Sequence, residues 1–283
     1  MARYFLFDNG SLEPASFKNL RRIANKLTRV IGDTIEPVSL LHSHRIDPVL
    51  LDGKPAAILE PTLRRYLQIG EKDFLLLPLF FGPSRALTHY LPERLAVLHQ
   101  DYPDLSVQLA APLVDLTEKQ DKAMATILAD RANTMIAAKQ LHRPAVILVD
   151  HGTPEPAVNA VRNHLAEQLE QLLGNSIDCL VAASMERRDG EQYAFNDPLL
   201  EVALDAPDYC KGEVIVLQLF LSPGRHAGEG GDISKICAAA QDRHPKLRIY
   251  RSELVGSHPN LIGILKRRLQ AGKAKKPMSI VQA

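Results

Sequence analysis

The 283-residue sequence has few cysteines and almost no net charge, and each shortage excludes a class of protein. The three cysteines, Cys179, Cys210 and Cys237, are odd in number and form no Cys-x-x-Cys pair. They therefore indicate reduced core thiols and argue against a disulfide framework or a thiolate zinc site. With 34 basic and 33 acidic residues, the chain has no global electrostatic attraction for nucleic acid or for a membrane surface.

Long apolar runs are also missing. No stretch approaches the 18 apolar residues of a membrane span, and the apolar run before Asp8 is too short for a secretory leader, so we expect a cytoplasmic protein without a membrane partner. No Gly-x-x-x-x-Gly-Lys segment occurs, and a P-loop nucleotide site is therefore not expected. With 46% hydrophobic and 24% charged residues, the composition is that of a globular protein with one large or two ordinary domains.

The chain repeats itself at a nearly constant offset. Residues 4–15 align with residues 146–157 at an offset of 142, and both segments carry Leu, Asp, Gly, Glu, Pro and Ala at the same places. Residues 79–85 align with residues 219–225 at an offset of 140. Near-constant offsets over half the length of a chain indicate a tandem duplication.

Each copy alternates apolar runs of strand length with longer segments of helical period. In the second copy we predict strands at 145–150, 177–183, 214–221 and 247–250, and helices at 158–173, 233–241 and 261–269. Strands that are apolar throughout are typical of a parallel sheet covered on both faces. We therefore expect two α/β, flavodoxin-like domains, each a four-stranded parallel sheet of order 2-1-3-4 flanked by helices. A predicted helix at 117–139 ends the first copy, which gives domains 1–143 and 144–283.

Two histidines follow strands that this order makes neighbours. His151 comes directly after the first strand of the second copy, and His226 follows the third strand, so both should open on one crevice. Neutral imidazoles bind divalent cobalt, nickel, iron or zinc, and two protein ligands leave coordination positions for a substrate. A lone histidine at a strand end is more often hydrogen-bonded locally. The first copy has Asn9 and Ala86 at these places, and this joint absence favours a single metal site in the second copy.

The segments that carry these histidines are Asp150-His-Gly-Thr153 and Leu219-Phe-Leu-Ser-Pro-Gly-Arg-His-Ala-Gly-Glu-Gly-Gly-Asp-Ile233. They resemble the sirohydrochlorin chelatases, the CbiX-like branch of the chelatase superfamily, in its long duplicated form. The resemblance covers nearly the whole chain and implies that His151 and His226 bind the metal over the macrocycle. It also implies that a monomer is possible, because short members achieve the same arrangement as homodimers. Gln218 departs from the family, which usually has proline there; Pro78 keeps it in the first copy.

Further polar residues lie near the same predicted rim. Glu186 follows the second strand of its copy, where related chelatases often have an acidic residue, although a solvated loop carboxylate is an equal alternative. Guanidinium groups could pair with the carboxylates of a tetrapyrrole, and glycines allow a close backbone approach. The expected substrate-binding residues are Arg187, Arg188, Arg225, Gly224 and Gly228. His42 and His44 are spaced to share one face of a strand, but a His-x-His pair without a third ligand is more often incidental.

These features predict a lyase that inserts a divalent metal into sirohydrochlorin or a related tetrapyrrole, in cobalamin or siroheme biosynthesis. Cobalt, iron and nickel all suit two imidazoles, and no nucleotide is expected. His151 and His226 would bind the ion and accept pyrrole protons, with Glu186 as a relay. The alternative is a non-catalytic carrier of tetrapyrrole or metal that uses the same cleft. A phosphate-ester enzyme is disfavoured because the chain shows no nucleophile or nucleotide motif for it.

Overall fold

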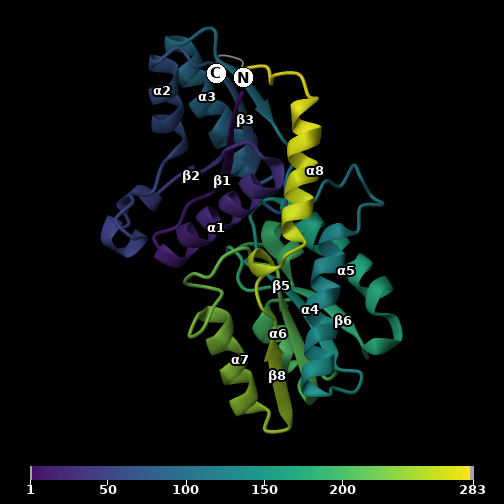
Figure 1. Ribbon diagram of the computed structural model, residues 1–283. Coiled ribbons are helices and arrows are strands. Elements are labelled where there is room, and N and C mark those ends of the chain that lie inside the picture. Colours follow the sequence, from purple (N-terminus) through teal and green to yellow (C-terminus); the bar gives the residue numbers. More distant parts are fainter. Residues whose placement is uncertain (1, 281–283) are drawn as a thin grey trace. The chain divides into compact units, whose positions relative to one another are not determined.

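The computed structural model describes residues 2–280 and contains two four-stranded parallel sheets (Figure 1). The first sheet consists of β1 (Arg3–Asp8), β2 (Ile35–Ser39), β3 (Asp73–Pro78) and β4 (Ser106–Leu109). The second sheet consists of β5 (Ala145–Asp150), β6 (Leu180–Ser184), β7 (Gly212–Gln218) and β8 (Leu247–Arg251). The strand orders β2-β1-β3-β4 and β6-β5-β7-β8 are the predicted order 2-1-3-4, so the predicted fold class is confirmed.

Helices connect the strands of both sheets. The helices that follow strands of the first sheet are α1 (Pro14–Ile31), α2 (Leu59–Gln68), α3 (Leu91–Asp101) and α4 (Ala123–Lys139). Those that follow strands of the second sheet are α5 (Pro156–Leu173), α6 (Leu200–Asp205), α7 (Asp232–Arg243) and α8 (Leu261–Lys273). The helix predicted from residue 117 begins later, at Ala123, and the six-residue α6 had no counterpart among the predictions. No helix within residues 2–280 is both long enough and apolar enough to cross a membrane.

Apolar strand residues form the cores, as expected for parallel strands covered on both faces. In β5, the four side chains from Val146 to Val149 are all fully buried. Alternate residues of β5 and β7 pack with α6 and α7 in one cluster that includes Ile147, Val216 and Ile233. Because both faces are covered, the polar ends of the strands are the parts of each sheet that remain available for chemistry.

The compact units of the structure differ from the sequence repeats. One unit comprises the chain up to Asp115 together with the segment from Ile262 onward, and the other comprises Leu116–Leu261. The last helix of each repeat therefore belongs to the unit built by the other repeat: α4 packs against α5 and β7, and α8 belongs with the first sheet (Figure 1). The predicted boundary at 143/144 concerns the repeat and stays a prediction.

Specific contacts hold α8 on the first unit. The side-chain amide of Gln108 in β4 donates to the carbonyl of Lys273 at 3.2 Å. Arg268, which is almost fully buried, donates to the carbonyl of Leu113 at 3.3 Å. Gly272 lies so close to β4 that an added Cβ would be 3.1 Å from the Cβ of Ala110. An added side chain at this position would therefore require Ala110 or the helix to shift by a few tenths of an ångström.

Equivalent contacts hold α4 on the second unit. His258 is buried, and its Nδ1 accepts from the backbone N–H of Asn260, so its Nε2–H donates to Asp130 of α4 at 3.0 Å. The next residue of the helix, Arg131, forms an ion pair of 2.8 Å with Glu253 and donates to the carbonyl of Leu254. His258 thus has a structural role in securing α4.

We predict that Gly272→Leu loosens the first unit selectively. The new side chain must displace β4, and overpacking of this kind lowers the free energy of unfolding by about 1–3 kcal/mol. Hydrogen exchange should accelerate in β3 and β4 and stay unchanged in β7 and β8. Gly263→Leu is the matched control, since a Cβ at this exposed position of the same helix meets nothing within 4 Å. Accelerated exchange in β7 and β8 would contradict the assignment of α8 to the first unit.

Candidate metal site

The turn after β5 is fixed by a close approach of two backbone segments. Gly152 has φ 91°, and a Cβ there would lie 1.8 Å from the carbonyl oxygen of Glu186, so only glycine fits. The crossing is held by hydrogen bonds from the N–H of Met185 to the carbonyl of Asp150 (2.8 Å) and from the N–H of Glu186 to that of His151 (3.2 Å). His151 is therefore placed beside Glu186 by backbone geometry.

A second turn returns His226 to the start of α7. The N–H groups of Asp232 and Ile233 donate to the carbonyls of Arg225 and His226, each at 3.2 Å. Gly231 permits this return, because a Cβ there would be 2.8 Å from the carbonyl oxygen of His226. The loop that follows β7 is thus closed on itself, and its histidine has a defined position.

The two turns bring the predicted histidines into contact. The ring centroids of His151 and His226 are 4.6 Å apart, with the rings edge to face at 76°. Glu186 Oε1 is 3.4 Å from His151 Nε2, so the predicted carboxylate joins the pair. The side chains of His151 and His226 are 46% and 30% exposed, which leaves the imidazoles open to an incoming ion.

Hydrogen bonds hold one ring nitrogen of each histidine. His226 Nδ1 is 2.8 Å from Asp232 Oδ2, and His151 Nδ1 is 3.1 Å from the carbonyl oxygen of Gly152. The carboxylate of Asp232 accepts, so a proton on His226 Nδ1 leaves its Nε2 lone pair for an ion. His151 has an acceptor oxygen near each ring nitrogen, the Gly152 carbonyl at Nδ1 and Glu186 Oε1 at Nε2. The bond from His226 also lowers the pKa of Asp232. Sequence reasoning missed this role of Asp232; its signal was an acidic residue at the first position of the helix that follows the histidine loop.

The predicted arginines occupy different environments. Arg187 donates to Asp197 at 2.9 Å and to the carbonyl of Gly190 at 3.1 Å, so it braces its own loop. The Arg188 guanidinium lies 5.9 Å from the centre of the Tyr193 ring. Arg225 is 80% exposed, with its Nε 3.8 Å from Asp232. Of the three, Arg225 is the one on the His226 loop with its side chain largely in solvent.

The predicted glycines belong to the same loop, whose internal bonds they permit. The N–H of Gly224 donates to the carbonyl of Ala227 at 2.9 Å, and Gly228, at φ 145°, accepts from Arg251 at 3.1 Å. Beneath this loop, the N–H of Gln218 donates to Ser252 Oγ at 3.0 Å, a bond that the proline usual in the family could not make.

The expectation for His42 and His44 is wrong in one respect. β2 ends at Ser39, so neither residue lies on a strand and period-2 alternation does not apply. His42 is in a loop at φ 63°, and His44 is in the short 3-10 turn Ser43–Arg45; both side chains are exposed. In the described part of the chain, no group of three or more His, Cys, Asp or Glu side chains is arranged to hold a metal ion.

Comparisons with known proteins agree with this architecture. Residues 145–271 match the family model CbiX, which confirms the predicted resemblance in the copy that carries both histidines. Among solved structures, the chain is similar to SirB from Bacillus subtilis with Fe3+, with a TM-score of 0.72 and 14% identity over 97% of this chain and 96% of that chain.

Two further structures have the same fold. The sirohydrochlorin chelatase SirB from Bacillus subtilis subspecies spizizenii, in complex with cobalt, has a TM-score of 0.70 and 13% identity over 99% of this chain and 100% of that chain. CbiX, the terminal enzyme for biosynthesis of siroheme in denitrifying bacteria, has a TM-score of 0.60 and 15% identity over 96% of this chain and 99% of that chain. No curated protein has a sequence that matches this chain.

Each unit has an aspartate at the end of its first strand, just before the turn, but the two aspartates have different surroundings. Ser39 Oγ donates to Asp8 at 2.6 Å, and Ser184 Oγ donates to Asp150 at 2.7 Å. The second unit adds Arg162, whose Nη1 is 3.7 Å from Asp150, whereas the first unit has Leu20 at the corresponding position. Burial raises the pKa of Asp150, and the charge of Arg162 opposes that effect. Burial raises the pKa of Asp8 to about 6.

We predict that the same substitution changes stability for different reasons at these two aspartates. Because the pKa of Asp8 is higher in the folded protein, ionisation destabilises the fold as the pH rises from about 4 to 6. Asp8→Asn removes that loss, so its free energy of unfolding relative to the parent should improve by about 2 kcal/mol between pH 4 and pH 7. Asp150→Asn leaves Arg162 without its counter-ion and should lose about 3 kcal/mol at pH 7. Urea unfolding at both pH values measures each, and equal effects of the two substitutions would refute the contrast.

Proposed function

We propose that this chain, which resembles the CbiX-like sirohydrochlorin chelatases, inserts a divalent metal ion into sirohydrochlorin or a related modified tetrapyrrole. The carrying observation is the contact between His151 and His226, with ring centroids 4.6 Å apart at the ends of two neighbouring strands. The metal is a substrate in this reaction. Cobalt is the first choice, with iron and nickel as alternatives, because two imidazoles accept all three.

The Nε2 atoms of the two imidazoles supply the ligands for the ion. Asp232 and the carbonyl of Gly152 hold the opposite ring nitrogens, which orients the imidazoles. Two protein ligands leave the other coordination positions to water and then to the pyrrole nitrogens of the substrate. A site of this kind binds an ion without enclosing it, as a chelatase must in order to release it.

Insertion also requires the loss of two pyrrole N–H protons. Glu186 is the carboxylate nearest to His151, and its side chain is 59% exposed. It can therefore accept a proton at the site and exchange it with solvent. The histidines accept protons when they are not bound to the ion. No nucleotide takes part in this scheme.

The tetrapyrrole carries carboxylates that need cationic partners. Arg225, on the loop of His226, keeps its guanidinium largely in solvent and could form bidentate pairs with them. Gly224 and Gly228 shape the same loop. The arginines Arg187 and Arg188 support the neighbouring loop from the end of β6 and contribute positive charge there.

We predict that His151→Ala or His226→Ala abolishes metal insertion and leaves the fold intact. Each removes a ligand, yet these partly exposed side chains contribute little to the core, so the stability loss should be about 1 kcal/mol or less. The assay follows the absorbance change of sirohydrochlorin with Co²⁺, Fe²⁺ or Ni²⁺. His42→Ala and His44→Ala are the controls, with near-parental rates expected. Normal insertion by His151→Ala would place the activity elsewhere, and binding without turnover by the parent would indicate a carrier.

We predict that Glu186→Gln slows insertion and leaves metal binding nearly unchanged. Glutamine keeps the shape of the side chain but cannot accept the proton, and general-base contributions are typically about 10²–10⁴-fold. Single-turnover insertion rates should fall, whereas Co²⁺ titration of the tetrapyrrole-free protein should give a similar dissociation constant. A parallel loss of Co²⁺ affinity would instead make Glu186 a ligand.

A further inference from the structure

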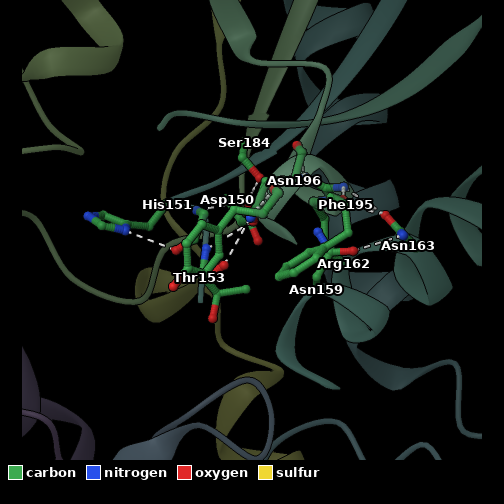
Figure 2. Close-up of polar contacts among 11 residues, drawn as sticks. Asp150, His151, Thr153, Asn159, Arg162, Asn163, Ser184, Phe195 and Asn196 are labelled. Carbon is green, nitrogen blue, oxygen red and sulfur yellow. Dashed lines mark hydrogen bonds and ion pairs between the residues drawn. The ribbon is translucent and has the colours of Figure 1, made fainter. Parts of the chain in front are cut away.

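We propose that Arg162 and Asn196 are positioning residues that hold the His151 turn in its metal-binding geometry. This inference rests on the proposed function, because it assigns the support for one of the two proposed ligands. The clamp consists of Arg162 from α5 and Asn196 from the 3-10 turn η5 (Glu191–Asn196), and Figure 2 shows both beside the turn. Both side chains lie below the surface: Arg162 is 2% exposed and Asn196 is fully buried.

The guanidinium of Arg162 donates hydrogen bonds from Nε, Nη1 and Nη2. Nη1 donates to Ser184 Oγ and to the carbonyl of Asn196, the latter at 3.0 Å. Nε and Nη2 both donate to Asn163 Oδ1, at 3.1 and 3.0 Å. A buried guanidinium with this many partners has one orientation, and it fixes the groups around it.

Two routes lead from Arg162 to the turn that carries His151. In the first, Ser184 donates to Asp150, and the same carboxylate oxygen accepts from the N–H of Gly152 at 3.0 Å. In the second, the side chain of Asn196 forms two hydrogen bonds with the backbone of Thr153. Its Oδ1 accepts from the N–H of Thr153 at 3.0 Å, and its Nδ2 donates to the carbonyl of Thr153 at 2.9 Å (Figure 2). Gly152 is therefore linked to Arg162 through Asp150 and Ser184, and Thr153 is linked to it through Asn196.

The unit without the histidines has simpler support for the same turn. Leu20 stands where the second unit has Arg162, and it is fully buried. There Ser43 Oγ accepts from the N–H of Ser11 and lies 3.1 Å from the Ser11 carbonyl oxygen, and it is 2.9 Å from Ser39 Oγ. A turn can therefore adopt this path without an arginine. The added clamp coincides with the copy in which the turn carries an imidazole.

Co²⁺ titration of the tetrapyrrole-free protein tests this role, with visible absorbance of the bound ion as the readout. Arg162→Lys keeps the charge and loses the fork, and the double variant Asp150→Asn, Arg162→Leu removes both charges so that neither is buried alone. Loss of outer support for a ligand typically weakens metal binding about 10–100-fold. We expect a loss of that size and an altered absorption spectrum in both variants, with parental circular dichroism.

A stability control separates positioning from general loosening. Leu63→Ala truncates a fully buried side chain in the first unit and should lower the melting temperature without changing the Co²⁺ affinity. Parental Co²⁺ affinity and spectrum in both Arg162 variants would overturn the inference, as would an equal loss of affinity in Leu63→Ala. His151→Ala in the same titration distinguishes a failure of the proposed metal site from a failure of the positioning role. If it also binds Co²⁺ normally, the proposed metal site itself fails. If it alone loses Co²⁺, the metal site stands and the positioning role of Arg162 fails.

Discussion

The site depends on one steric constraint, the contact between the residue after the first strand and the backbone beyond the second. In the second unit, Gly152 lies against the carbonyl of Glu186 with no room for a Cβ, and in the first unit Gly10 lies in the same way against Leu41. This contact sets where the residue before the glycine must lie. His151 is therefore held next to Glu186, and His226 needs only a closed loop after the neighbouring strand to reach them. Both units have this backbone geometry, and only the second unit places histidines on it.

The two units show what a duplicated fold keeps and what it changes. The aspartate, the glycine and the serine of the next strand are retained, since Asp8, Gly10 and Ser39 repeat the contacts of Asp150, Gly152 and Ser184. The residues that differ are the one before the glycine, Asn9 or His151, and the one in the following helix, Leu20 or Arg162. The shared contacts maintain the turn, and the differing ones give one turn an imidazole and a buried cation beneath it.

Much of this architecture could be predicted from the sequence because it follows from local pattern. Apolar runs gave the central strands closely, as with β5, and the strand order then brought His151 and His226 to one edge. Tertiary contacts were beyond such reasoning. The pairing of His226 with Asp232 depends on a loop that turns back, and Arg162 reads as a polar residue on an amphipathic helix until the fold places Asp150 above it. The destination of α4 and α8 was also hidden, because helical period gives no information about which sheet a helix will cover.

The exchange of α4 and α8 has a consequence for the order in which the protein is completed during synthesis. The unit that carries the two histidines is one continuous stretch, Leu116–Leu261, and all of its strands and helices have been made before residue 262 is added. The first unit is discontinuous, and its sheet must wait for the segment from Ile262 onward before α8 can cover it. The part of the chain synthesised first is therefore the last to acquire all of its packing partners. On the ribosome, the sheet that still awaits a covering helix is the one made first, and the unit with the two histidines can acquire all of its packing partners without delay.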